Sequence, residues 1–312
     1  MNYIKVIRPK AWLKNVFVFV PIVFAIQLFN LDKLLTTLAA FGAFCMISSA
    51  VYLFNDICDA KKDALHPVKK SRPIASGKIK RSVASAYAIA LAGVGIAVSL
   101  LVVNRTMTAI ALGYLCLNLA YTILLKNVAV LDCFCIAAGF VLRVYAGGAA
   151  SGSAVSDWLF LTVTAASLFM AFGKRRGEIL KLRSPTADAS VHCAGQAEPD
   201  SLPKLRSPAA ESSSQTRTVL QQYNIDFLKG MVFICAGLAV VFYSLWAMEK
   251  SNMIYTVPLM IFMVAKYLLN IHKADSHGDP TTVVFSDVTF LLSGALYAAV
   301  TVVLLYGGKV II

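Results

Sequence analysis

Three carboxylates lie close together in the stretch from Asn55 to Asp63, which reads NDICDAKKD. If this stretch is helical, Asp56, Asp59 and Asp63 fall within about 60° of one another around the helix axis. Unpaired carboxylates on one face would repel one another, and a divalent cation is the usual resolution. Mg²⁺ suits an all-oxygen site of this kind. The spacing therefore predicts a magnesium site on these three residues. The simpler alternative is a solvated helix end whose charge is balanced by the neighbouring lysines.

A basic run, ALHPVKKSRPIASGKIKR, begins directly after the acidic stretch. Pro67 and Pro73 would interrupt a continuous helix there. A metal held by carboxylates neutralises part of a pyrophosphate, and basic side chains take its remaining oxygens. We therefore predict that Lys69, Lys70 and Arg72 contact a phosphate. The alternative is that these cations only set the membrane topology and touch anionic lipid head groups.

Polar groups inside apolar runs are costly in a membrane, so they are functional candidates by default. Arg143 is the charge that lies deepest inside such a run, and its alternative role is an ion pair within the bundle. Lys126 and Asp132 bracket a turn between two runs and could simply pair with each other. The other candidates for substrate binding, close to the ends of apolar runs, are Lys14, Asn15, Asn55, Tyr121, Lys174 and Arg175.

The composition predicts a polytopic membrane protein of the all-α class. Hydrophobic residues make up 58% of the 312 positions and charged residues 14%, whereas a soluble domain has about 25% charged residues. A net charge of +13 would favour nucleic-acid binding in a soluble protein. In a membrane protein the placement of the charges is more informative, and we expect no nucleic-acid partner. The seven cysteines lack zinc-finger spacing and are expected to be reduced and packed.

The apolar runs predict about nine transmembrane helices within a single membrane domain, residues 1–312. They lie at about 15–31, 34–54, 83–103, 107–125, 129–149, 157–172, 227–247, 252–270 and 287–306. Residues 184–217 differ from the rest, because they are rich in Ser, Pro and Ala and lack aromatic residues. Such a segment buries too little apolar surface to order itself, so we expect a flexible cytoplasmic insertion.

The basic residues fall mainly on one side of these predicted spans. Of the 29 Lys and Arg, 24 lie before the first span, after the even-numbered spans or at the end of span eight, four lie on the opposite side, and Arg143 lies within a span. Positive residues mark cytoplasmic loops. We therefore expect an inner (plasma) membrane protein with its N-terminus and acidic stretch in the cytoplasm and its C-terminus outside.

The stretches NDICDAKKD and HPVKKSRPIASG resemble the UbiA superfamily of intramembrane prenyltransferases, whose first signature is Asn-Asp-x-x-Asp-x-x-x-Asp. Further stretches, RPKAWLKN, LKNVAVLD, GFVLRVYAGG, GKRRGEI, LQQYNIDFL and GDPTTVVFSD, extend the resemblance over nearly the whole chain. Within the superfamily the chain is most similar to the branch of decaprenyl-phosphate phosphoribosyltransferases. The Ser- and Pro-rich insertion is a departure from that pattern.

The resemblance implies a nine-helix bundle with a polar cavity that faces the cytoplasm, and Mg²⁺ bound by Asn55, Asp56, Asp59 and Asp63. It implies transfer of 5-phosphoribose from phosphoribosyl pyrophosphate to a polyprenyl phosphate, with release of pyrophosphate. Lys69, Lys70 and Arg72 would hold phosphate oxygens of the sugar substrate. Lys14, Lys126, Arg143, Lys174 and Arg175 would guide the lipid phosphate, whose tail stays in the membrane lipid. Whether the chain forms a homo-oligomer is left open.

The run GKRRGEI, Gly173 to Ile179, helps to distinguish phosphoribosyl transfer from prenyl transfer. Ordinary UbiA enzymes carry a second Asp-rich motif at this place, but this chain has three cations and one Glu. A basic second half suits two highly anionic substrates and favours phosphoribosyl transfer. The alternative is a prenyltransferase that moves a prenyl group from a prenyl diphosphate to an aromatic or other acceptor. A transporter or lipid-binding scaffold is less favoured, since transporters place charged sites near the membrane midplane.

Overall fold

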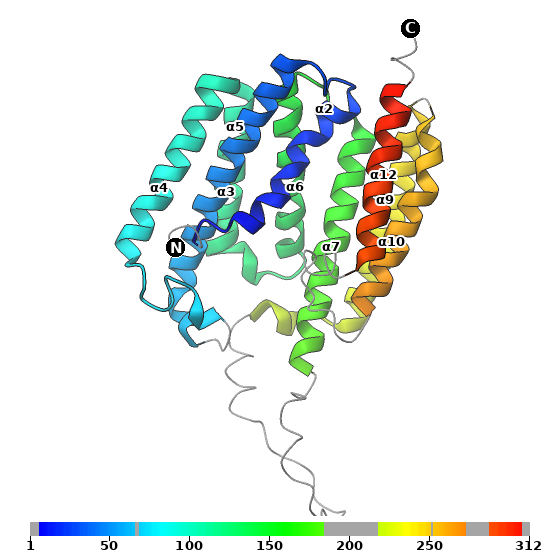
Figure 1. Ribbon diagram of the computed structural model, residues 1–312. Coiled ribbons are helices and arrows are strands. Elements are labelled where there is room, and N and C mark those ends of the chain that lie inside the picture. The colour runs from blue at the N-terminus through cyan, green and yellow to red at the C-terminus, as the bar shows by residue number, and fades with distance from the viewer. Residues whose placement is uncertain (1–5, 66–68, 184–217, 251, 273–286, 308–312) are drawn as a thin grey trace, which may run out of the picture.

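The computed structural model describes residues 6–65, 69–183, 218–250, 252–272 and 287–307, and every regular element in these ranges is a helix (Figure 1). In chain order the elements are η1 (Pro9–Phe19), α2 (Val20–Phe24), α3 (Leu31–Leu65), η2 (Lys69–Ser71), α4 (Arg81–Val98), η3 (Ser99–Val103), α5 (Arg105–Ile123), η4 (Leu125–Asn127), α6 (Leu131–Ser151), α7 (Asp157–Arg183), η6 (Thr218–Gln222), α9 (Ile225–Met248), η7 (Met253–Thr256), α10 (Val257–His272) and α12 (Val288–Tyr306).

The fold is an all-α bundle of membrane-spanning helices, which confirms the class expected from the sequence. Backbone N–H and C=O groups have no water to bind inside a bilayer, so an apolar run of this length forms a helix. Seven segments of the described chain are long and apolar enough to cross a membrane. In α3 and α6, 56% of the most apolar stretch is buried, whereas the value is 17% in α12. Helices α3 and α6 are therefore central in the bundle, and α12 turns most of its apolar surface outward to lipid.

The helices form two groups that meet at α6 and α7 (Figure 1). In the first group α3 packs mainly on α4, and α6 contacts both α3 and α5. In the second group α7 packs mainly on α9, while α10 contacts α9 and α12. Contacts between α6 and α7 join the groups. The short elements η2, η4 and η6 lie at the end of the bundle where α3 and α7 finish (Figure 1).

Two of the predicted spans differ from the structure, so the count of nine is approximate. The first predicted span, 15–31, breaks into the 3₁₀ helix η1 and the short helix α2, and the chain then turns through Ile26, whose φ is 56°. The span predicted at 157–172 belongs to α7, which continues as helix to Arg183. It continues because charged side chains in its last turns are paired, as described below. The predicted insertion at 184–217 lies outside the described residues.

Candidate active site

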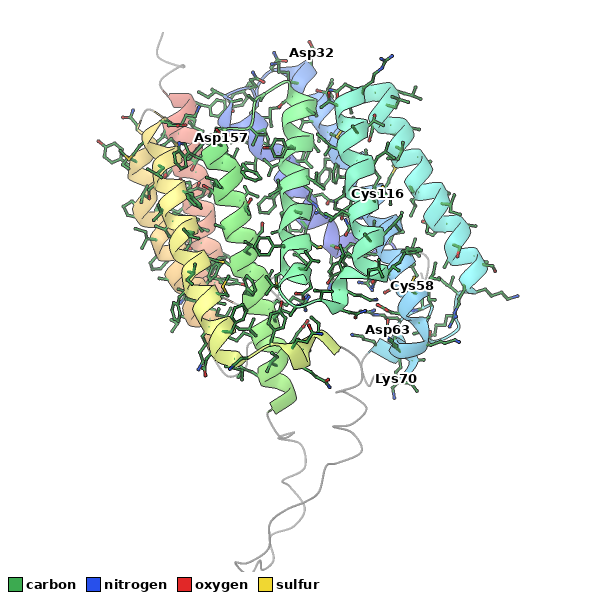
Figure 2. The ribbon with its side chains drawn as sticks, turned by 180° about the vertical axis from the view of Figure 1, so that it is seen from behind. Asp32, Cys58, Asp63, Lys70, Cys116 and Asp157 are labelled. Carbon is green, nitrogen blue, oxygen red and sulfur yellow. The ribbon has the colours of Figure 1, made fainter. Side chains whose placement is uncertain are left out.

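One helix carries all three carboxylates of the NDICDAKKD stretch. The helix α3 passes without a break from its apolar part into the acidic stretch, as the predicted common face requires. Asp56, Asp59 and Asp63 therefore lie in its last turns. Asp63 lies at one end of the bundle and Asp32, from the first turn of the same helix, at the other (Figure 2).

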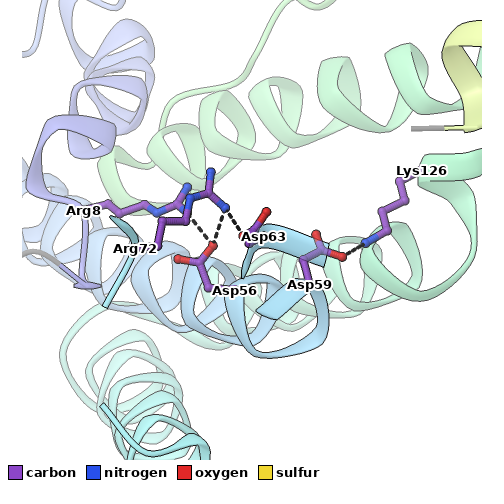
Figure 3. A network of polar contacts seen from close by, with 6 residues as sticks. All are labelled: Arg8, Asp56, Asp59, Asp63, Arg72 and Lys126. Atoms are coloured by element: carbon purple, nitrogen blue, oxygen red, sulfur yellow. Dashed lines mark hydrogen bonds and ion pairs between the residues drawn. The ribbon is translucent and has the colours of Figure 1, made fainter. Parts of the chain in front are cut away.

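Two arginines from different segments neutralise Asp56 and Asp63 (Figure 3). Arg72 follows η2, and its Nη1 lies 3.0 Å from Asp56 Oδ1 and 2.6 Å from Asp63 Oδ2. Arg8, which precedes η1, places its Nη2 2.5 Å from Asp56 Oδ1. Both carboxylates are buried, each residue being 5% exposed. Burial strengthens these charge-assisted hydrogen bonds, because less water competes for the same oxygens.

Asp59 points toward a different cation. Its Oδ1 lies 2.7 Å from Lys126 Nζ, which comes from η4 in the connection between α5 and α6 (Figure 3). The alternative pairing of Lys126 with Asp132 is therefore wrong, since Asp132 pairs with Arg175. The site thus brings together the end of α3, the residues before η1, the segment after η2, and η4. Its three carboxylates are balanced by three cations.

Carboxylate oxygens are suitable ligands for a divalent metal, and in the structure these carboxylates are paired with arginine and lysine side chains. In the described ranges no three His, Cys, Asp or Glu side chains are gathered closely enough to hold a metal ion. One nitrogen of Arg72 nevertheless contacts Asp56 and Asp63 together. A single positive charge can therefore reach both carboxylates, and their oxygens are the donors that Mg²⁺ prefers. The donor set is of the kind that would hold a magnesium ion, with Asp56 and Asp63 as its ligands.

A second charged group is buried where α6 begins. Asp132, which is fully buried, accepts hydrogen bonds from Arg175 Nε at 2.6 Å and from the Tyr223 hydroxyl at 2.5 Å. Arg175 also reaches Glu178 Oε2 at 2.5 Å and is only 2% exposed. Arg176 is 7% exposed and donates to the carbonyl of Ile271. These arginines hold α7 against its neighbours. Because Arg175 is buried and already paired, direct contact with a substrate phosphate is not favoured.

Arg143 lies buried in the centre of the bundle among neutral partners. Its Nε donates to Asn15 Oδ1 at 2.8 Å, and its Nη2 donates to the Tyr114 hydroxyl at 2.8 Å. Its Nη1 donates to the carbonyl of Gly139 at 2.6 Å. The described residues include no carboxylate within ion-pair distance of Arg143, so the alternative role, an ion pair inside the bundle, is not found. Asn15 orients this guanidinium and also donates to Ser48.

The remaining predicted residues are less closely joined to the carboxylates. Lys70 is exposed at the edge of the bundle, near the end of α3 (Figure 2). Asn55 is half-buried on α3. Four others are half-buried and each makes a polar or ring contact, namely Lys14, Lys69, Tyr121 and Lys174. Sequence reasoning missed the contact of Arg8 with Asp56, because 48 positions separate the two residues. The only signal was its place in the basic RPK stretch before the first apolar run.

Two cavities lie at the other end of the bundle. One has a volume of about 280 Å³ and is lined by residues that include Gln27, Trp246 and Lys250. The other, of about 500 Å³, includes Asp157, which Figure 2 places at the same end as Asp32 and far from Asp63. Neither includes the carboxylates of α3, so the polar cavity expected beside them stays a prediction.

A helical membrane bundle with buried carboxylates and facing cations at one end is the arrangement of an intramembrane protein with a candidate site for anionic ligands. The model of the UbiA prenyltransferase family matches residues 16–175, and the chain belongs to this family.

Named relatives extend this assignment over most of the chain. It is 32% identical to the decaprenyl-phosphate phosphoribosyltransferase of Corynebacterium glutamicum, over 91% of this chain and 80% of the relative. It is 28% identical to the protein of that name from Mycobacterium tuberculosis, over 97% of this chain and 94% of the relative. Among solved structures, a UbiA homologue from Archaeoglobus fulgidus bound to GPP and Mg²⁺ superposes with a TM-score of 0.71. That likeness covers 98% of this chain and 99% of the other at 16% identity, so it supports the fold alone.

Proposed function

We propose that this protein transfers 5-phosphoribose from phosphoribosyl pyrophosphate to a polyprenyl phosphate and releases pyrophosphate in a magnesium-dependent reaction. The observation that carries the proposal is the 32% identity, over 91% of the chain, to a decaprenyl-phosphate phosphoribosyltransferase. The charged end of α3 supports it, because an anionic sugar substrate requires both a metal and basic side chains.

Asp56 and Asp63 are the residues that would hold the metal, with Asp59 as a third ligand once Lys126 turns away. A bound Mg²⁺ would supply positive charge to the pyrophosphate as it leaves. Arg8 and Arg72, which neutralise these carboxylates, would then turn to the phosphate oxygens of the substrate. Lys126 would do the same from η4. The carboxylates and the substrate thus compete for the same cations, and binding is an exchange of partners.

The chemistry needs no strong general base. The C1–O bond of phosphoribosyl pyrophosphate breaks, and its electron pair leaves with the pyrophosphate. An oxygen of the lipid phosphate forms the new bond to C1, and this phosphate is already ionised at pH 7. The main task of the protein is therefore to stabilise the departing negative charge. A cluster of carboxylates and cations is suited to that task.

The basic run in the second half of the chain gives less support to phosphoribosyl transfer than its sequence suggests. Two of the three cations in GKRRGEI, Arg175 and Arg176, are buried and bonded to protein groups. The preference for phosphoribosyl transfer over prenyl transfer therefore rests on the named relatives. Arg143 stays a candidate for guiding the lipid phosphate, because it is positively charged, central and paired only with neutral groups.

The proposal is tested in isolated membranes from cells that produce the protein. Phosphoribosyl pyrophosphate labelled in the ribose, together with polyprenyl phosphate and Mg²⁺, is expected to give a labelled lipid. EDTA is expected to abolish the product, and added Mg²⁺ to restore it. Membranes without the protein provide the control. Absence of labelled lipid from active membranes, with every substrate supplied, contradicts the proposal.

The second candidate is the prenyltransferase reaction typical of the wider family. It is favoured by the match of residues 16–175 to the UbiA prenyltransferase family. In a parallel assay the labelled substrate is a prenyl diphosphate and the acceptor is aromatic. A product from this pair alone would assign the chain to the second reaction.

The chain is a multi-pass membrane protein, and we place it in the inner membrane with the end that carries Asp63 facing the cytoplasm. The sidedness rests on the distribution of Lys and Arg. Soluble phosphoribosyl pyrophosphate would then reach the carboxylates directly from the cytoplasm.

A further inference from the structure

The connection between α5 and α6 contains a strained turn beside the candidate active site. Val130 has φ 68° and ψ −50°, and the N–H of Leu131 donates to the carbonyl of Ala129 at 2.8 Å. This hydrogen bond across one residue, with positive φ, defines a γ-turn of the rare and strained kind. A β-branched residue avoids this backbone region, because its Cβ substituents crowd the chain. Something must therefore hold the turn in place.

The hydroxyl of Tyr223 is the group that holds this turn. It accepts a hydrogen bond of 2.7 Å from the N–H of Val130 and donates one of 2.5 Å to Asp132 Oδ1. The neighbouring Gln222 accepts from the N–H of Ala129 at 3.2 Å and donates to the carbonyl of Asn127 at 3.2 Å. Two side chains from a segment more than ninety positions away thus fasten the backbone of residues 127–130.

The fastened turn connects directly to the site. Lys126 immediately precedes it, and the ammonium of Lys126 lies 2.7 Å from Asp59 Oδ1. Lys126 belongs to η4, whose last residue, Asn127, is the first of the fastened residues. Asp132 in turn is fixed by Arg175 Nε at 2.6 Å, so Tyr223 has a rigid acceptor. Burial and the hydrogen bond to Asp132 raise the pKa of Tyr223, which keeps the hydroxyl protonated and able to donate.

We propose that Tyr223 is a positioning residue, which holds the strained turn at Val130 and thereby aims Lys126 at the candidate active site. The inference rests on the proposed function only for the role of Lys126 toward a substrate. The contact between Tyr223 and the turn is independent of the reaction.

The test combines two substitutions, Tyr223→Phe and Val130→Gly, singly and together. Tyr223→Phe is expected to lower kcat/KM for ribose transfer by about tenfold to a hundredfold, the scale of a small misplacement of a reacting group. Glycine adopts positive φ without strain. Val130→Gly is therefore expected to restore most of the lost activity in the double variant, although it loses some packing of the valine side chain.

Tyr306→Phe is the matched control. The hydroxyl of Tyr306 also bonds two backbone groups, the carbonyl of Val23 and the N–H of Leu28, but it belongs to α12 and packs beside α2. This control is expected to keep kcat/KM for ribose transfer. Wild-type activity in Tyr223→Phe overturns the proposal. So does a double variant as slow as Tyr223→Phe when Val130→Gly alone is active, since Tyr223 would then act through Asp132 and not through the turn.

Hydrogen–deuterium exchange separates this inference from the proposed function. Tyr223→Phe is expected to speed the exchange of amide protons in residues 127–131, and Tyr306→Phe is not. This readout requires no substrate. If the wild-type protein transfers no ribose, the proposed function fails while the exchange result still decides the role of Tyr223. Unchanged exchange at these residues in Tyr223→Phe overturns the inference whatever the activity.

Discussion

At the scale of single residues, the site is a balance between three carboxylates and three cations. Arg72 occupies the central position, because one of its nitrogens contacts both Asp56 and Asp63. Without this arginine the two buried carboxylates would face each other with only Arg8 to compensate. Arg72 therefore neutralises both carboxylates, and in the proposed reaction it also binds a substrate phosphate.

Arg72→Ala should raise the KM for phosphoribosyl pyrophosphate by about 10- to 100-fold, since a hydrogen bond to a charged group contributes about 1.5–3 kcal/mol. Steady-state kinetics in membranes measures the effect. Lys78→Ala is the matched control, because Lys78 is exposed in the same connecting segment. An equal rise in KM for both variants would mean that general charge, and not the position of Arg72, governs binding.

Residue types and spacing predicted that the three carboxylates share one helix face and that a basic run with Arg72 follows them. Both features are local in the sequence. The contacts that Arg8, Asp132 and Tyr223 make could not be found in this way. Their partners are distant in sequence, and only packing of helices brings them together. The contact at Val130 is also tertiary, since its backbone N–H donates a hydrogen bond to Tyr223 of another segment.

At the scale of elements, the first segments of the chain lie very close to α6. A Cβ on Gly147 would come within 1.9 Å of the carbonyl oxygen of Val18 in η1. Pro21 of α2 is the next neighbour, at 3.1 Å. The backbone of η1 therefore passes directly over this glycine, and the same element carries Asn15 to Arg143. The close approach fixes one side of the bundle core.

Gly147→Ala should destabilise the protein by about 1–3 kcal/mol or more, because the clash is with backbone and cannot be relieved by a rotamer change. Thermal unfolding of the detergent-solubilised protein measures it. Gly113→Ala in α5 is the control, since its Cβ would meet nothing within 4 Å. Alanine is a better helix former by about 0.5–1 kcal/mol, so this variant should be as stable as wild type or slightly more. A tolerated Gly147→Ala would contradict the close packing of η1.

Most helices were predictable from the length of the apolar runs, but the start of the chain was not. The run at 15–31 is apolar enough for a span, yet contact with α6 and the turn near Ile26 produce a 3₁₀ helix and a short α-helix instead. Hydropathy measures the preference for lipid and carries no information on such contacts. The continuation of α7 through a charged run depends in the same way on buried partners, Asp132 and Glu178 for Arg175.

At the scale of the whole molecule, the two ends of the bundle differ in charge and role. One end gathers the carboxylates of α3 with Arg8, Arg72 and Lys126, and the other has the two cavities. The excess of Lys and Arg predicts that the first end faces the cytoplasm. Substrate supply from the cytoplasm and a lipid acceptor held in the bilayer are compatible with this orientation.

Cysteine labelling of intact cells should verify the orientation. In a variant without the seven natural cysteines, Ala154→Cys should react with a membrane-impermeant maleimide. Ser76→Cys should react only after the cells are broken. Both positions are exposed at connections between helices, at opposite ends of the bundle. The reverse pattern would place the carboxylates outside and exclude a cytoplasmic sugar substrate.

The central claim is that the carboxylates at the end of α3 enable ribose transfer from phosphoribosyl pyrophosphate. The most direct measurement compares Asp56→Asn and Asp63→Asn with Asp32→Asn, the same change in the first turn of the same helix, in the labelled-lipid assay. We expect the first two variants to lose about a hundredfold or more in rate, the scale for removal of charge stabilisation, and Asp32→Asn to keep its activity. Full activity in Asp56→Asn and Asp63→Asn, at equal protein levels, would contradict it.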